Sequence, residues 1–312
     1  MAHAGAALDD FLLRHAPRTP EPVDAALLDA RRSLSQALTV LGSVNDESLE
    51  RPWTWRGGEA DIRYGFYRQL EALQEARART RPLLAAALAH DPPARPLVAM
   101  ASAARWDLHG LVAGLSEADL DADPGGDEWT VRQTLAHICG GQRAYGWFTS
   151  WWLAQRDLRG EALPQRVPDE LAELLPEEET EGVGSLADIG RRLDDILDLS
   201  AGALAGLDDA ALAEGARWSG VPVTIGFRIG RWSSHIREHT VQLEKTLAML
   251  GRQPGEVDRL LRLIAGAYGR LEEELYCWPA SETGPAEAAE LVAAVAQDVV
   301  RGAREVAAAA AA

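Results

Sequence analysis

The sequence predicts an all-α protein. Alanine is abundant, β-branched residues are few, and apolar residues recur at the spacing of one helix face. Glycine and proline fall mainly between the long periodic stretches. With 312 residues, 47% of them hydrophobic, the chain can bury a sizeable core, as one large domain or as two small ones.

Eight helices are expected along the chain, separated by turns that contain glycine, proline or acidic residues. They are predicted at about 23–43, 60–90, 95–114, 130–157, 185–206, 222–250, 254–276 and 285–308. Pro82 should kink or break the second helix, and Thr130 with Gln133 forms a capping box at the start of the fourth. Residues 159–184, rich in proline, glutamate and glycine, are expected to form a loop.

Three connections between helices share one pattern, in which an acidic stretch leads to a leucine and then to a tryptophan. The three copies are Gly42–Leu49 before Trp53, Gly114–Leu120 before Trp129, and Gly206–Leu212 before Trp218. The pattern predicts three helical hairpins with related turns, whose leucine and tryptophan pack the connection onto the end of a bundle.

Charge and cysteine content limit the possible partners. The formal net charge of −17 would repel nucleic acid phosphates and anionic membrane surfaces, so neither is an expected partner, and the charge is explained by solubility. Cys139 and Cys277 are too few for a disulfide framework and fit a reducing compartment. No signal peptide and no stretch of membrane-spanning length is evident, so the expected location is cytoplasmic.

The strongest functional signal is a pair of histidines, His235 and His239, four residues apart in one predicted helix. Residues at this spacing share a helix face, with Cβ atoms about 5–6 Å apart, so two imidazoles can close on one metal ion. A third imidazole from a neighbouring helix would leave one metal position open for water or substrate, as in catalytic sites. The alternative is a chance pairing among seven histidines.

The residues around the histidines resemble the DinB-like superfamily, which includes mycothiol-dependent maleylpyruvate isomerases and bacillithiol-dependent transferases. The two motifs that carry the resemblance are Trp129-Thr-Val-Arg-Gln-Thr-Leu-Ala-His137 and His235-x3-His239-x2-Gln242. The resemblance covers roughly residues 95–252 and implies an antiparallel four-helix bundle. It also implies a divalent metal held by His137, His235 and His239, and three imidazoles suit zinc or nickel.

Other residues are candidates for the same site. Arg228, Arg231 and Gln242 fall near the two histidines by helical period. The arginines could receive a carboxylate through bidentate contacts, or they could pair with one of the many acidic residues. Gln242 could hydrogen-bond a metal ligand or a bound water, or it could cap a buried backbone group. Tyr145 lies on the same helix side as His137.

The sequence Cys139-Gly140-Gly141 stands in the middle of the predicted helix at 130–157. A glycine inside a helix costs about 1 kcal/mol relative to alanine, so the pair predicts that a neighbouring helix approaches the backbone closely. Cys139 lies about 200° around the helix from His137, and a small buried thiol is therefore expected there in place of a ligand.

The chain is expected to divide into an N-terminal degenerate helical hairpin, a metal-binding four-helix bundle and a C-terminal helical extension, at residues 1–92, 93–252 and 253–312. Eight residues after Trp129 stands His137, whereas eight residues after Trp55 stands Arg63. The N-terminal hairpin is therefore predicted to bind no metal. Arg63 and its neighbours either line an anion-binding cleft or, as the preferred interpretation, join the hairpin to the bundle.

Other catalytic motifs are absent from the sequence, including a Gly-x-Ser-x-Gly turn, a phosphate-binding glycine loop and a glutamate inside the histidine pair. The resemblance implies a metal-dependent transferase or isomerase that uses a low-molecular-weight thiol such as mycothiol or bacillithiol. Its partners would be a small-molecule thiol or an organic acid, and its catalytic residues stay unassigned. The alternative is a non-catalytic metal-binding stress or interaction protein, and a monomer or homodimer suits both.

Overall fold

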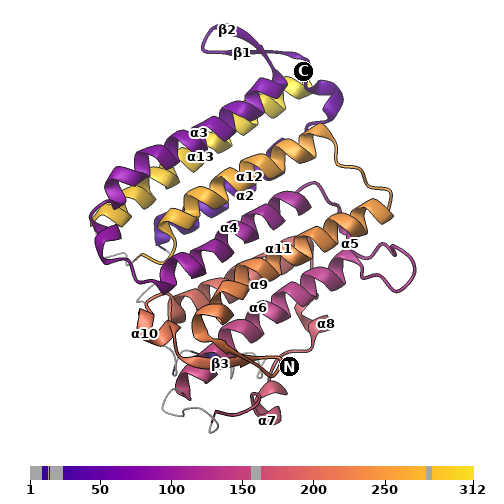
Figure 1. Cartoon of the computed structure of the whole chain (residues 1–312). Coiled ribbons are helices and arrows are strands. Elements are labelled where there is room, and N and C mark those ends of the chain that lie inside the picture. Colours follow the sequence, from indigo (N-terminus) through magenta and orange to yellow (C-terminus); the bar gives the residue numbers. More distant parts are fainter. Residues whose placement is uncertain (1–8, 13, 15–23, 156–162, 279–282) are drawn as a thin grey trace. The chain divides into compact units, whose positions relative to one another are not determined.

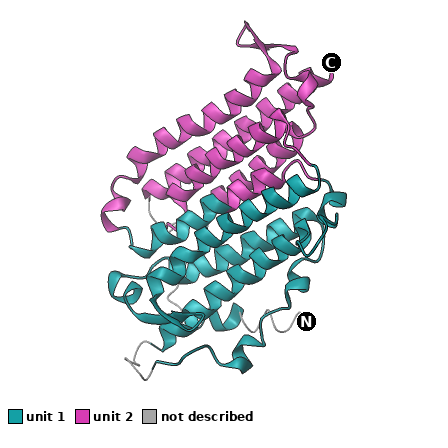
Figure 2. Cartoon of the chain, turned by 45° about the vertical axis from the view of Figure 1, so that its right-hand side comes forward, with its two compact units in different colours: residues 1–22, 91–104, 116–251 teal, residues 23–90, 105–115, 252–312 magenta. Residues whose placement is uncertain are grey.

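The computed structural model describes residues 9–12, 14, 24–155, 163–278 and 283–312 (Figure 1). These residues form helices, two short strand pairs and connecting loops, which confirms the all-α helical bundle. The chain divides into two compact units, each discontinuous in sequence (Figure 2). Unit 1 comprises residues 1–22, 91–104 and 116–251, and unit 2 comprises residues 23–90, 105–115 and 252–312.

Unit 1 is built on α6 (Val131–Ala154), α9 (Leu186–Leu204), α11 (Ile225–Met249) and the first part of α4 (Ala94–Val112). Helix α6 packs between α9 and α11. It runs antiparallel to α11, since its first turns lie beside the last turns of α11. It runs parallel to α9, because Cys139 lies beside Ile189 and Gly146, further along α6, lies beside Ser200, further along α9.

The core of unit 1 contains several large aromatic side chains. Trp147, Trp152 and Trp232 are almost fully buried, and burial of each such side chain contributes about 1.5–3 kcal/mol. Helix α6 begins at the capping box that the sequence predicts: Thr130 accepts the backbone N–H of Gln133, and the Gln133 side chain accepts that of Thr130.

Unit 2 contains α2 (Ala25–Leu41), α3 (Ile62–Leu84), α12 (Glu256–Leu275), α13 (Thr283–Ala311) and the second part of α4. Helices from the N-terminal hairpin and from the C-terminal extension therefore share one core. At its centre Glu272 is fully buried and accepts hydrogen bonds from Arg31 and Arg105. Arg63, at the start of α3, pairs with Glu256 at the start of α12.

Two β-hairpins, which the sequence does not predict, directly precede the helices α3 and α11. Strand β1 (Pro52–Trp55) pairs with β2 (Gly58–Asp61) before α3, and β3 (Gly215–Trp218) pairs with β4 (Val221–Thr224) before α11. Both turn residues of each hairpin have positive φ, which is the two-residue turn that matches the twist of paired strands. Pro222, expected near the first turn of a helix, lies in β4.

Short helices occupy the remaining connections. They are η1 (Asp46–Ser48), η2 (Ala87–His90), α5 (Glu117–Leu120), α7 (Asp169–Ala172), α8 (Glu178–Glu181) and α10 (Asp209–Leu212). Thus the predicted loop at 159–184 carries two helical turns within its described residues, and Pro82 stands in the last turn of α3. Among the described helices, none has an apolar stretch of the length needed to cross a bilayer.

Candidate metal centre

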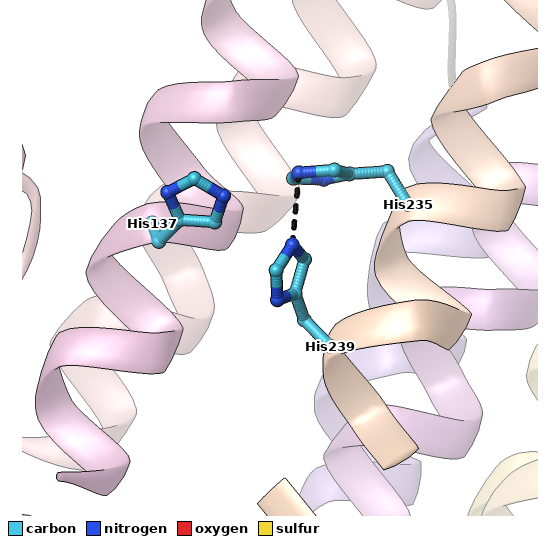
Figure 3. A group of neighbouring side chains, drawn as sticks. All are labelled: His137, His235 and His239. Atoms are coloured by element: carbon cyan, nitrogen blue, oxygen red, sulfur yellow. Dashed lines mark hydrogen bonds between the residues drawn. The ribbon is translucent and has the colours of Figure 1, made fainter. Parts of the chain in front are cut away.

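The three histidines predicted to form a metal site come together in unit 1 (Figure 3). His137 projects from the second turn of α6, and His235 and His239 project from successive turns of α11. Each offers a ring nitrogen within 4.8 Å of the others, and the Nε2 atoms of His235 and His239 are 3.1 Å apart. Because α6 and α11 are antiparallel, residues 98 and 102 positions apart in sequence can share one space.

Two of the imidazoles are oriented by acceptors on their outer nitrogens. His137 Nδ1 lies 2.9 Å from a carboxylate oxygen of Glu178, and His239 Nδ1 lies 2.7 Å from the side-chain oxygen of Gln242. An acceptor at Nδ1 holds the proton there, so the Nε2 lone pair is free for a metal. Gln242 was a candidate from the sequence, whereas Glu178, in a connection with no periodic signal, was missed.

His235 is the most enclosed of the three, with 6% of its surface exposed. Its Nδ1 lies 3.3 Å from the side-chain nitrogen of Gln142, which also donates to the backbone oxygen of Trp232. Burial, followed by the neighbouring His239 and His137, lowers the pKa of His235 from 6.5 to about 3. Burial also lowers the pKa of His239. Both imidazoles are therefore neutral near pH 7, as a metal ligand must be.

Gly141 explains how the ring of His235 fits against α6. A Cβ atom at this position would lie 2.5 Å from Cε1 of His235, closer than a carbon atom can approach without displacement. At Gly140 the nearest neighbour of a Cβ would be the Glu178 side chain at 3.6 Å, an ordinary contact. The glycine pair predicts a close helix approach, and at Gly141 the approaching group is a ligand side chain of α11.

Trp129 covers one side of the cluster. Its ring centroid lies 4.9 Å from that of His137 and 6.3 Å from that of His239, with which it is stacked. The segment before α6 is held to α11, because Thr246 donates to the backbone oxygen of Trp129. Sequence reasoning gives this tryptophan only a packing role at the end of the bundle; in the structure it also lies against two candidate ligands.

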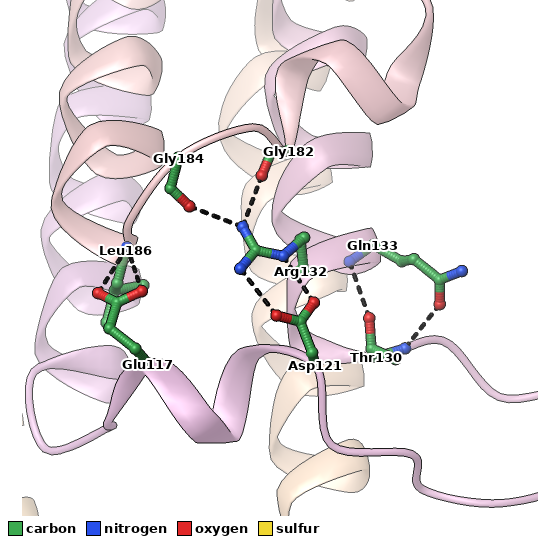
Figure 4. Close-up of polar contacts among 8 residues, drawn as sticks. All are labelled: Glu117, Asp121, Thr130, Arg132, Gln133, Gly182, Gly184 and Leu186. Carbon is green, nitrogen blue, oxygen red and sulfur yellow. Dashed lines mark hydrogen bonds and ion pairs between the residues drawn. The ribbon is translucent and has the colours of Figure 1, made fainter.

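The short helix that carries Glu178 is fixed to α6 by a network of polar contacts (Figure 4). Arg132 donates to the backbone oxygens of Gly182 and Gly184 and forms two contacts with Asp121. Glu117 accepts the backbone N–H of Leu186 at the start of α9. Nearby, Glu181 is buried and accepts from Arg143. These contacts keep Glu178 beside His137 although the residues around it have little regular structure.

The histidines open into a cavity of about 640 Å³. Its walls include Tyr145, Phe148 and Trp152 of α6, Trp218 of β3, and the side chains of Arg228 and Arg231. The ring of Tyr145 meets that of His235 edge to face, with centroids 5.2 Å apart. A concave, partly apolar space with a few charged groups beside the cluster is typical of a small-molecule site.

The two arginines differ in their partners. Arg231 pairs with Glu238 at 3.0 Å and lies over the Trp218 ring, so an acidic residue already neutralises it. Arg228 is 4% exposed and donates to the hydroxyl of Thr149 and the backbone oxygen of Arg217, both uncharged. Burial lowers its pKa to about 10, which leaves it charged near pH 7. Among the described residues Arg228 has no carboxylate partner, and a buried cation of this kind favours an anionic group nearby.

The donor set fits a divalent metal. A tetrahedral zinc ion with bonds of about 2.0–2.1 Å requires nitrogens roughly 3.3 Å apart, close to the spacing of the His235 and His239 nitrogens. Among the described residues this is the group of histidine, cysteine and acidic side chains that could hold an ion. Cys139 takes no part, because it is buried on the other side of α6 and its pKa is raised to about 12, chiefly by burial.

Together the fold and the cluster define a helical-bundle protein with a three-histidine candidate metal site between two antiparallel helices. A family model described as the DinB superfamily matches residues 100–243, which confirms the resemblance for this part of the chain. The match extends from α4 into α11 and includes all three histidines. No curated protein and no solved structure matches the chain.

Proposed function

We propose that unit 1 is a divalent-metal-dependent transferase or isomerase that uses a low-molecular-weight thiol. The observation that carries the proposal is the opening of the three-histidine cluster into a cavity that also contains the buried cation of Arg228. A purely structural metal is enclosed by protein ligands, whereas a catalytic one keeps a position for substrate. The cavity therefore favours the enzyme over a non-catalytic metal-binding protein.

A bound divalent metal would supply a Lewis acid that stabilises a thiolate or polarises a carbonyl group. His137, His235 and His239 would hold it, and zinc or nickel suits three imidazoles. Glu178 and Gln242 would keep two of the rings in the tautomer that presents Nε2. Mycothiol and bacillithiol are the thiols that the family resemblance suggests.

Arg228 would bind a carboxylate of the thiol or of an organic acid substrate. Its guanidinium is positioned by Thr149 and by the backbone of β3, so little side-chain entropy is lost when an anion binds. The aromatic wall formed by Tyr145, Phe148 and Trp152 would exclude water from the reacting groups. Arg231, the first candidate by helical position, would instead shape the rim through its contacts with Glu238 and Trp218.

The test combines metal analysis with thiol titration. The unmodified chain should carry one divalent ion, and His239→Ala should lose it, whereas His90→Ala, an exposed histidine outside the cluster, should not. Mycothiol or bacillithiol should bind the metal-loaded protein. Arg228→Gln should weaken that binding by roughly tenfold to a hundredfold without changing the metal content. Equal metal content in His239→Ala would refute the site, and a metal-loaded protein that binds neither thiol would refute thiol use.

A further inference from the structure

The hairpin and helix that form half of the metal site in unit 1 have a counterpart in unit 2. In both units, four-residue strands flank a two-residue turn with positive φ, and a long helix begins directly after the second strand. Asp61 and Thr224 cap these helices in the same way. The first helical residues, Ile62 and Ile225, are both fully buried. This match sets the register of α3 against α11.

The helices packed against α3 and α11 correspond as well. Helix α13 runs antiparallel to α3, because Gly302 lies beside Gln69 and Val306 beside Gly65. Helix α13 also packs against α2. The two helices run parallel, as α6 and α9 do, because the C-terminal end of α13 contacts Ser48 and Arg51, which follow the C-terminal end of α2. The cavity of unit 2 is lined by Val295, Val299 and Gly302, at the spacing with which His137, Gly141 and Ala144 line the cavity of unit 1.

All three ligand positions are apolar in unit 2. His235 and His239 stand ten and fourteen residues after Ile225, and Ala72 and Ala76 stand at the same distances after Ile62. Val295 occupies the place of His137. The sequence comparison, which counts eight residues from a tryptophan, aligned Arg63 of α3 with His137 of α6. In the structure the counterpart of α3 is α11. No ion-binding group of side chains lies among the described residues of unit 2.

The two units share an arginine and a tryptophan at the cavity rim but differ at the three positions that carry histidine in unit 1. Arg68 lies over the Trp55 ring at 4.4 Å, as Arg231 lies over Trp218 at 5.3 Å, and each arginine faces a glutamate seven residues later. Arg68 pairs in addition with Glu71, which is the closer of its two acidic partners. In both arginines the Nε atom is buried and has no hydrogen-bond partner among the described residues. This side-chain arrangement therefore occurs both with the three histidines, in unit 1, and without them, in unit 2.

The cations of the unit 2 cavity are placed differently from those of unit 1. The counterpart of the buried Arg228 is Gly65, where Val306 fills the space. Conversely, the counterpart of Gln242 is Arg79, which has no ion-pair partner among the described residues. The resulting cavity measures about 440 Å³. Its lining carries four arginines against three acidic residues: Arg56, Arg68, Arg79 and Arg301 against Glu75, Asp298 and Glu305.

We propose that the cavity of unit 2 is a second binding site, which takes a small organic carboxylate without a metal. Arg56 and Arg79, which form no ion pair among the described residues, provide charge-assisted hydrogen bonds, and the rings of Trp53 and Trp55 provide an apolar wall. These two arginines supply positive charge in a cavity whose three counterpart ligand positions are apolar. This inference depends on the register of the two units and not on the activity proposed for unit 1.

The test is calorimetric titration of citrate, at low ionic strength, into metal-free full-length protein. All samples carry Arg228→Gln, so that the candidate carboxylate position of unit 1 does not contribute. One saturable binding event is expected. Arg56→Gln with Arg79→Gln should weaken it more than about tenfold, because two charge-assisted contacts are lost. The charge-matched control is Arg259→Gln with Arg304→Gln, two exposed arginines outside the cavity, and it should bind as before.

A neutral substitution separates a pocket from general surface charge. Ala72→Phe fills the cavity without changing the charge and should abolish binding. The proposal is overturned by the absence of saturable citrate binding in the parent protein, or by equal weakening in the cavity variant and its charge-matched control. It is also overturned if Ala72→Phe, folded by circular dichroism, binds citrate as well as its parent.

Discussion

Neighbouring side chains determine what the three histidines can do. Glu178 and Gln242 each place an acceptor oxygen at an outer ring nitrogen, and they come from two different elements. Such partners hold a metal ligand in one orientation, and their loss typically weakens metal affinity tenfold to a hundredfold. The site is therefore a set of metal-ligand candidates in which two of the three rings are oriented by neighbouring oxygens.

The pH dependence of stability should reveal the burial of His235. Its pKa is lowered from 6.5 to about 3, chiefly by burial, so between these values the unfolded chain binds a proton that the folded chain does not. The free energy of unfolding of metal-free protein should therefore fall as pH falls through this window, by at most about 1.4 kcal/mol per pH unit. Above the unfolded pKa this contribution vanishes.

Urea unfolding of metal-free protein between about pH 7 and about pH 4 measures this effect. His235→Gln removes the titrating group and should reduce the slope with pH. The exposed His90→Ala serves as the control and should keep the original slope. If His235→Gln shows the same slope as the unmodified chain, then His235 is protonated in the folded state and the burial argument fails.

At the scale of elements, α6 and α11 approach closely because α6 has glycine where α11 has a ligand. Gly141 lies under the ring of His235, whereas Gly140 lies under the flexible side chain of Glu178. The two adjacent glycines thus differ in what an added methyl group would meet. Each glycine lowers the stability of α6 by about 1 kcal/mol relative to alanine. Of the two, only Gly141 is required for steric reasons by a candidate metal ligand.

This difference predicts opposite results for two neighbouring substitutions. Gly141→Ala should displace His235 and lower metal affinity by tenfold or more, by about the amount expected for a misplaced ligand. Gly140→Ala should leave metal affinity unchanged and stabilise the chain by roughly 0.5–1 kcal/mol, because alanine favours the helix. Metal titration and urea unfolding of both variants measure the two effects. Equal metal affinities would show that His235 is free to move.

At the scale of the whole molecule, one bundle arrangement is used twice with different chain order. In unit 1 the chain passes through α6, α9 and then α11. In unit 2 the corresponding helices are α13, α2 and α3, so the equivalent of α6 comes from the C-terminal end. Unit 2 consequently needs both ends of the chain for its core, and neither end alone can bury its apolar face.

The correspondence predicts that a metal site can be built in unit 2. In a chain whose own site has been removed by His239→Ala, the substitutions Ala72→His, Ala76→His and Val295→His should restore one equivalent of divalent ion when Val299→Gly, the counterpart of Gly141, makes room for the ring at position 72. These positions match those of the three histidines in unit 1. Elemental analysis provides the measurement. The control places the third histidine at the exposed Arg304, outside the cavity, and should bind weakly. A folded variant that carries the three histidines and Val299→Gly but no metal would disprove the correspondence.

The sequence by itself determined the features that depend on local spacing. Helical period located the long helices, the capping box placed the start of α6, and the i, i+4 rule put His235 and His239 on one face. The motif around His137 selected the third candidate ligand, which the structure brings to the other two. In each case the geometry is set within a few residues of the chain.

Only the tertiary structure decided the features that depend on contacts between distant segments. Glu178 reaches His137 because a connection with no periodic pattern folds onto α6. Arg231 has an acidic partner because Glu238 lies beside it, whereas Arg228 contacts the backbone of β3 and has no acidic partner among the described residues. The four-residue strands are too short to give a period-two signal. The sequence also could not predict that the N- and C-terminal helices share one core. Helical period shows that a helix face is buried, but it does not show which helix covers that face.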